Sequence, residues 1–341
     1  MTTRLLLLFL LLDALVVIMG FVPTNDNGMM IRRPSLLCSG EQTTIHSRIY
    51  QRQSSLGMAS TQQQQNNDYR PYTQVISDVD DTLKSSGGVT VAGVALGGID
   101  IQYTRGEFYP GVFQFMLELS MPTLDNDDDE NDTENEKSQF LYPPKVAVLT
   151  ARAEEFKVAL ELKGNSKLAK AFRKTGEKAG IDDWGLGPVL YGSVAEWVIQ
   201  DRKGMRKFSN FERLIEQDPT GTIMQYVYVG DTGELDQEAG ETMLREYPEV
   251  VKAVFLHVVS DAPFPRVPPP KLINGRPVVF FRTYVGAAAR AVQLGLMQEE
   301  GLMRVIVEAE AALKGVPTSN EKWLDLERDI SEAYRTLSVD L

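Results

Sequence analysis

The segment from Asp78 to Thr82 reads Asp-Val-Asp-Asp-Thr and places three acidic side chains within four residues. Negative charges crowded at the end of a strand are costly unless a cation relieves them. Asp78 and Asp80 are two residues apart, so an extended backbone directs both side chains the same way. Such a pair suits a hard cation with oxygen ligands, such as Mg²⁺, although an acidic turn without a metal can have the same sequence.

Two later residues are suited to an anionic substrate. Thr150 stands in the segment Leu-Thr-Ala-Arg; its hydroxyl can donate to a phosphoryl oxygen, but a threonine at a strand end is also a common helix cap. Lys207 immediately precedes an amphipathic run, and we expect it to begin a helix over 207–216. A lysine there opposes the helix dipole and needs a nearby anion or solvent. An exposed lysine is the usual case, and Lys203 is a competing candidate.

The most specific segment, 230–236, reads Gly-Asp-Thr-Gly-Glu-Leu-Asp and contains Asp231 and Asp236. Its glycines would let the main chain approach a ligand closely. We expect Asp231 to lie near the first acidic cluster, because the carboxyl ends of parallel strands meet at one edge of a sheet.

The elements that position these residues follow from the pattern after about residue 69, where short apolar runs alternate with helical periodicity. Nearly continuous apolar runs are typical of parallel strands buried on both faces. The alternation predicts an α/β fold with a doubly wound, mostly parallel sheet and helices on both faces. The predicted strands are 73–77, 145–149, 188–190, 225–229, 252–257 and 278–281. The predicted helices are 109–120, 154–162, 166–178, 207–216, 235–246, 300–314 and 321–337.

The same pattern divides the chain into parts. We expect one domain over 68–297, interrupted by a solvated acidic insertion at 125–137, and C-terminal helices over 298–341 that dock on the core. Residues 85–106 are rich in glycine and β-branched residues and are predicted to form a small hairpin-like flap. Its valines and Leu96 could dip into lipid, although packing on the protein's own surface is the more common use of such residues.

The composition excludes several classes of function. Acidic residues outnumber basic ones by 47 to 35, and eight of the acids lie in 125–137, so a broad basic surface for duplex nucleic acid is not expected. Cysteine occurs once, at Cys38, and histidine only at His46 and His257. This excludes an intrachain disulfide and nearly excludes a zinc cage or a Cys–His nucleophile. His257 stands in an apolar strand and is interpreted as a core residue.

The N-terminus has the features of a targeting sequence. Residues 1–20 contain Arg4 near their start and continue as an apolar run that is short for a membrane span, which predicts a signal peptide. Residues 21–67 contain few acids and many hydroxyl side chains, like a transit peptide. A signal followed at once by Phe21 resembles the two-part presequences of plastid proteins. Secretion to another endomembrane lumen and a permanent anchor are the alternatives, and no transmembrane segment is expected in the mature chain.

Taken together, the four segments resemble, in their order and context, the motifs of the haloacid dehalogenase superfamily of phosphohydrolases. The resemblance covers roughly 68–285. It implies that Asp78 is the nucleophile and Asp80 the general acid and base, with Thr150 and Lys207 binding the phosphoryl group. It further implies that Mg²⁺ is held by Asp78, the main-chain carbonyl of Asp80, and Asp231, and that Asp236 supports Lys207 or a metal-bound water. The resemblance gives no role to Asp81.

Finer details are similar to the phosphatidate phosphatase branch of that superfamily, namely 230–238, the flap, and the closing segment 278–288. Because no folded cap is expected over the site, the resemblance implies a bulky phosphomonoester, such as a phospholipid at a membrane surface. A soluble phosphorylated metabolite or a phosphoprotein stays open as the substrate. A receiver-like signalling module, phosphorylated without turnover, and a non-catalytic phospholipid-binding member are the rival readings.

Overall fold

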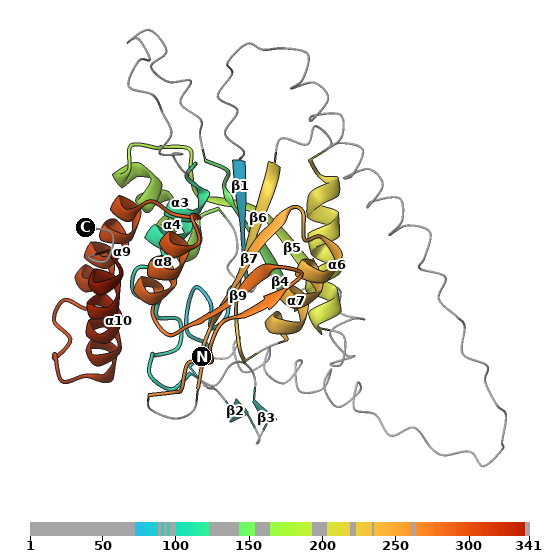
Figure 1. The fold of residues 1–341 in the computed structure, drawn as a ribbon. Helices are drawn as coiled ribbons and strands as arrows, with labels where there is room; N and C mark the ends of the chain where they lie inside the picture. The colour runs from blue at the N-terminus through green and yellow to red at the C-terminus, as the bar shows by residue number, and fades with distance from the viewer. Residues whose placement is uncertain are drawn as a thin grey trace, which may run out of the picture. The chain divides into compact units, whose positions relative to one another are not determined.

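A seven-stranded sheet forms the centre of the part of the chain that the structure describes (Figure 1). The computed structural model describes residues 72–87, 90–91, 94–95, 100–122, 143–153, 164–192, 203–218, 223–233, 235–260 and 264–337. The sheet order is β5-β4-β1-β6-β7-β9-β8, and every neighbouring pair is parallel except β8 with β9. The strands are β1 (Tyr72–Ser77), β4 (Val146–Ala153), β5 (Leu186–Gly192), β6 (Ile223–Asp231), β7 (Val251–His257), β8 (Lys271–Ile273) and β9 (Arg276–Phe281).

The six predicted strands are confirmed, and most of their apolar side chains are buried beneath the flanking helices. Val75 and Ile76 of β1, for example, are fully buried although their side chains point to opposite faces. The sequence prediction missed β8, a short edge strand that joins β9 through Asn274 and Gly275. Both turn residues have positive φ, at 49° and 75°, and an Asn-Gly pair is the usual signal for such a two-residue hairpin turn.

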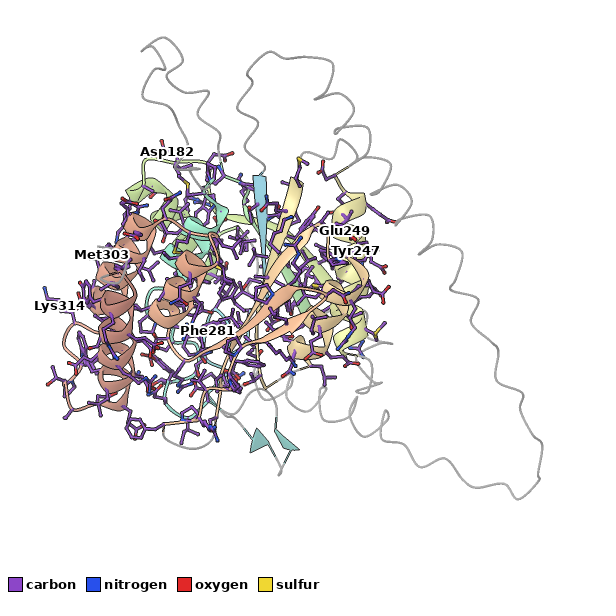
Figure 2. All side chains as sticks on the ribbon, in the orientation of Figure 1. Asp182, Tyr247, Glu249, Phe281, Met303 and Lys314 are labelled. Atoms are coloured by element: carbon purple, nitrogen blue, oxygen red, sulfur yellow. The ribbon has the colours of Figure 1, made fainter. Side chains whose placement is uncertain are left out.

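Helices cover both faces of the sheet (Figure 1). On one face lie α3 (Val112–Ser120), α4 (Lys167–Lys178) and α8 (Tyr284–Gln293), with α9 (Glu299–Ala312) and α10 (Glu321–Leu337) packed outside them. On the other face lie α6 (Lys203–Glu216) and α7 (Asp236–Glu246). Figure 2 places Phe281 beside α8 and Tyr247 on the side of α6 and α7, whereas Met303 points outward from α9.

The C-terminal helices share the core of the sheet. Leu302, Val305 and Ile306 of α9 and Leu326 of α10 belong to the same buried apolar cluster as the residues of β1 and β9. The docking of these helices that the apolar spacing predicts is therefore confirmed. The sequence prediction did not include α8, which begins after Thr283; the Thr283 side chain accepts a hydrogen bond from the Gly286 main chain as an N-cap.

Some predictions lie outside the described residues. These are the presequence over 1–67, the acidic insertion over 125–137 and the helix over 154–162. The flap contains a two-stranded antiparallel hairpin, β2 (Thr90–Val91) with β3 (Val94–Ala95), as predicted. The flap side chains proposed to meet lipid are not among those described.

The strand order defines where a ligand would bind. The chain proceeds from β1 outward to β4 and β5, then returns to place β6 on the other side of β1. The order therefore reverses between β1 and β6, and the crevice beyond their carboxyl ends is the usual ligand site of an open parallel sheet. Asp78 directly follows β1, and Asp231 is the last residue of β6.

Candidate active site

Three buried aspartates meet at this reversal point. One carboxylate oxygen from each of Asp78, Asp231 and Asp236 lies within 4.8 Å of the others. The sheet register explains the first two, because Ser77 is paired with Val229 and the Asp78 main-chain N–H donates to the Val229 carbonyl at 3.0 Å. Asp236 joins them from the first residue of α7. The sequence prediction that these segments converge is confirmed.

Lys207 places an ammonium group inside the cluster. Its Nζ lies 3.0 Å from Asp78 Oδ1 and is also hydrogen-bonded to Asp236 Oδ1. The predicted position of Lys207 in its helix is wrong. Helix α6 begins at Lys203, so Lys207 lies in the second turn and not at the helix N-terminus, where its charge would oppose the helix dipole. The side chain is 2% exposed, and its acidic partners compensate the buried charge.

The geometry around Gly230 fixes Asp236. A Cβ atom at Gly230 would lie 2.7 Å from both the Cβ and Oδ2 of Asp236, so a side chain there would displace the carboxylate. Asp236 Oδ2 accepts a hydrogen bond from the Asp231 main chain at 3.2 Å, and its Oδ1 accepts from Lys207. Both oxygens of Asp236 therefore have protein partners, which suits the supporting role that the resemblance implies.

The charges in the cluster fit a divalent cation. Three carboxyl groups and one ammonium group are gathered in this buried site, so acidic groups outnumber basic ones. Carboxylate oxygens are the ligands that Mg²⁺ and Ca²⁺ prefer, so the donor set is compatible with the predicted Mg²⁺ at Asp78 and Asp231.

The other two predicted site residues lie beside this cluster. Asp80 is partly exposed two residues beyond Asp78 and forms an isolated backbone bridge with Lys84. Thr150 is 2% exposed in β4 and follows Val148, the parallel partner of Ser77, by two residues. The register thus places Thr150 just beyond the level of Asp78 on the neighbouring strand. Their roles in binding and catalysis stay predictions.

Sequence reasoning missed Tyr228, a buried residue of β6 on which the charged groups of the cluster act. Its hydroxyl makes no hydrogen bond to the described part of the chain. Burial raises the pKa of Tyr228 well above its usual value, with Asp236 adding to the effect and Lys207 opposing it. A tyrosine in a buried strand three residues before Asp231 gives no sequence signal that distinguishes it from an ordinary core residue.

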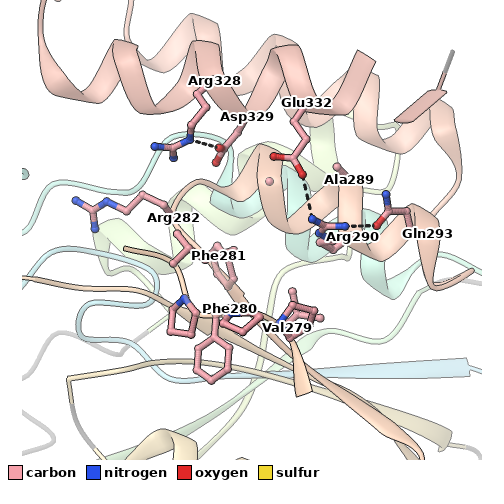
Figure 3. Close-up of a pocket in the computed structure, with 15 residues that line it drawn as sticks. Val279, Phe280, Phe281, Arg282, Ala289, Arg290, Gln293, Arg328, Asp329 and Glu332 are labelled. Atoms are coloured by element: carbon pink, nitrogen blue, oxygen red, sulfur yellow. Dashed lines mark hydrogen bonds and ion pairs between the residues drawn. The ribbon is translucent and has the colours of Figure 1, made fainter. Parts of the chain in front are cut away.

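A cavity of about 390 Å³ lies apart from the acidic cluster, between β9, α8, α10 and the proline segment 268–270 (Figure 3). Figure 3 shows Arg290 of α8 paired with Glu332 of α10, and Arg328 paired with its neighbour Asp329 on α10. None of the acidic-cluster residues lines this cavity. The cluster at the reversal point, not the cavity, is therefore the candidate active site.

No family model, curated protein or solved structure matches the chain. A function can therefore be inferred only from the fold and from the residues of the site. What the fold and the cluster define is a Rossmann-like, mostly parallel α/β protein with a buried aspartate triad able to bind a metal ion. Among the helices that the structure describes, none has the length and apolar character to cross a membrane.

The carboxyl group of Asp81 should make stability depend on pH. Burial raises its pKa from 3.8 to about 6, although hydrogen bonds from Ser86 oppose the shift. The folded protein therefore binds this proton more tightly than the unfolded chain does. The resulting stabilisation is complete below pH 3.8 and is lost as the pH rises through about 6.

We therefore expect Asp81→Asn to remove part of the decline in unfolding temperature that the wild type shows between about pH 4 and pH 6, measured by calorimetry with a chelator present. Burial lowers the pKa of His257 to about 4, which gives a slope of opposite sign, but both proteins share it. Asp182→Asn, at an exposed position, is the control. Parallel pH profiles for Asp81→Asn and the wild type would contradict the prediction.

Proposed function

We propose that the protein is a Mg²⁺-dependent phosphomonoester hydrolase that works through an aspartyl-phosphate, with a phospholipid such as phosphatidate as its substrate. The observation that supports this best is the placement of Lys207 between Asp78 and Asp236, with Asp231 alongside, at the reversal point of the sheet. A nucleophile, a cation for the phosphoryl oxygens and a metal-binding pair are then present in one buried cluster.

In the proposed reaction, an oxygen of Asp78 attacks phosphorus, forming an acyl phosphate while the bond from phosphorus to the alcohol oxygen breaks. Asp80 gives its proton to the departing alcohol. It then takes a proton from the water that attacks the acyl phosphate, which releases inorganic phosphate and restores Asp78. Thr150 and Lys207 donate to the phosphoryl oxygens, because phosphoryl transfer is catalysed mainly by positioning and charge compensation. Mg²⁺, held by Asp78, Asp231 and the Asp80 carbonyl, would add positive charge there.

The phospholipid part of the proposal is supported by the sequence resemblance and by the small flap. Between β1 and α3, the described chain contains a two-stranded hairpin where a cap could be inserted. The sequence predicts no folded cap over the site, and an uncapped site favours a substrate whose phosphate stands on a bulky or membrane-embedded body. Because of the predicted two-part presequence, we propose that the protein is located in a plastid. The secretory pathway or an endomembrane lumen is the alternative.

The test is an assay of phosphate release by the purified chain from phosphatidate vesicles and from a panel of soluble phosphomonoesters, with Mg²⁺ and after chelation. We expect release that needs Mg²⁺ and that is faster from the vesicles. Vesicle hydrolysis slower than that of every soluble compound would remove the lipid assignment and leave the hydrolase. Stable phosphorylation of the chain without release would favour a receiver-like module instead.

A further inference from the structure

The loop that carries Asp78 and Asp80 is held from behind by two side chains from distant parts of the chain. His257 Nδ1 lies 2.7 Å from the Asp81 main-chain carbonyl. The Tyr284 hydroxyl donates to the Thr82 carbonyl at 2.6 Å. His257 is the last residue of β7 and Tyr284 is the first residue of α8. These hydrogen bonds therefore connect the loop after β1 to β7 and to α8.

The loop needs such support because its backbone is strained. Asp81 has a φ of 57°, a left-handed conformation that residues with a side chain disfavour, although Asp and Asn adopt it more readily than most. Strain of this kind persists only where the surroundings over-determine it. Besides its carbonyl contact, Asp81 accepts hydrogen bonds from the Ser86 main chain and hydroxyl, at 2.7 and 2.9 Å.

The two supporting side chains are themselves held rigidly. The His257 ring is 1% exposed, lies 4.3 Å from the Tyr109 ring centroid and stacks on Tyr284 at 6.0 Å. Its Nε2 faces the Arg282 carbonyl at 3.1 Å. The buried Arg282 guanidinium is paired with Asp100 and with Asp325 of α10, while its Nη1 also donates to a main-chain carbonyl.

Both ring nitrogens of His257 face carbonyl oxygens, which only accept hydrogen bonds. Burial, reinforced by the Arg282 guanidinium, lowers the pKa of His257 to about 4, so the ring is neutral near pH 7. A neutral imidazole has one N–H and can donate to only one of the two carbonyls. We assign the N–H to Nδ1, because its contact with the Asp81 carbonyl is the shorter of the two.

We propose that His257 and Tyr284 are positioning residues: their hydrogen bonds to the Asp81 and Thr82 carbonyls hold the loop so that Asp78 and Asp80 face the Asp231–Lys207 cluster. The inference rests on the proposed hydrolase function for its kinetic consequence, but the loop geometry itself can be measured without turnover. Neither residue touches the substrate in the proposed reaction.

Two amide substitutions separate the two contacts of His257. The amide nitrogen of asparagine takes the place of Nδ1, whereas that of glutamine takes the place of Nε2. We expect His257→Asn to keep kcat within about threefold of the wild type. His257→Gln and Tyr284→Phe should lower kcat by roughly 10- to 100-fold, with KM nearly unchanged, because a displacement of about 1 Å in a catalytic group has effects of this size.

Hydrogen exchange of the main-chain amides over 79–86 gives the second readout. Exchange should be faster than in the wild type for His257→Gln and Tyr284→Phe, and near the wild-type rate for His257→Asn. Tyr334→Phe, at an exposed position on α10, is the control for loss of a tyrosine hydroxyl. If both amide variants fail to fold, Tyr284→Phe, which removes a single oxygen atom, decides the matter alone.

The inference would be overturned if Tyr284→Phe had the same hydrogen-exchange rates and the same kcat as the wild type. It would also be overturned if His257→Gln kept its activity and His257→Asn lost it. A wild type with no turnover, combined with faster loop exchange in Tyr284→Phe, would instead remove the proposed function and leave the positioning role standing. The two failures are therefore distinguishable.

Discussion

Asp78→Asn is expected to lower kcat for phosphomonoester hydrolysis by about 10⁴-fold or more, an effect of the size seen when a catalytic nucleophile is removed. The amide has nearly the shape of the carboxylate, but its nitrogen and oxygen cannot form a stable acyl phosphate. Lys207 keeps its contact with Asp236, so the buried ammonium is not left without an acid. The loss should appear in single-turnover phosphate release, with no phosphorylated protein detected by mass spectrometry.

Asp182→Asn serves as the matched control, because this exposed aspartate lies outside the cluster (Figure 2) and its change should leave kcat within about twofold. The wild type, stopped with acid during turnover, should carry one phosphoryl group. An Asp78→Asn protein that retains a tenth of the wild-type rate would mean that water attacks phosphorus directly. The cluster would then bind metal and substrate without a covalent intermediate.

The convergence of the site was predictable because it depends on topology alone. Parallel strands that alternate with helices bring their carboxyl ends to one edge, so Asp78, Thr150 and Asp231 had to lie at that edge once the strands were recognised. The apolar runs that mark these strands are strong signals, since strands such as β1 are buried on both faces.

The position of Lys207 was not predictable by the same means. Gly204 and two basic residues in the first turn of α6 disfavour a helix start there, through glycine's low propensity and the helix dipole. The helix nevertheless begins at Lys203, because packing of the following turns against the sheet decides its extent. One additional turn changes Lys207 from a residue at a helix end into a buried member of the cluster.

His257 illustrates a different limit. Its apolar neighbours correctly predict burial, and the ring is indeed in the core. The partners of its nitrogens are main-chain carbonyls, and one of them belongs to Asp81, 176 residues earlier in the sequence. Carbonyls are the same in every residue, so no local pattern could indicate that this histidine contacts the loop that carries Asp78 and Asp80.

Lys207→Met should have the largest effect on stability, and one that depends on metal. Without the ammonium, the carboxylates of Asp78, Asp231 and Asp236 face one another in a buried site. Breaking a buried ion pair on one side costs about 3–5 kcal/mol, which corresponds to a fall of roughly 10 °C in unfolding temperature for a domain of this size. In addition, kcat should fall by about 10²- to 10³-fold, because a cation aimed at the phosphoryl oxygens is lost.

The dependence on Mg²⁺ separates this explanation from a simple loss of packing. Because the variant has more uncompensated negative charge, saturating Mg²⁺ should raise its unfolding temperature by more than it raises that of the wild type. Lys178→Met is the matched control, since Lys178 pairs with Glu308 on the surface at 2.7 Å and such pairs contribute little. Equal Mg²⁺ shifts in Lys207→Met and the wild type would show that the metal does not share the charge of this cluster, and the Mg²⁺ site would have to lie elsewhere.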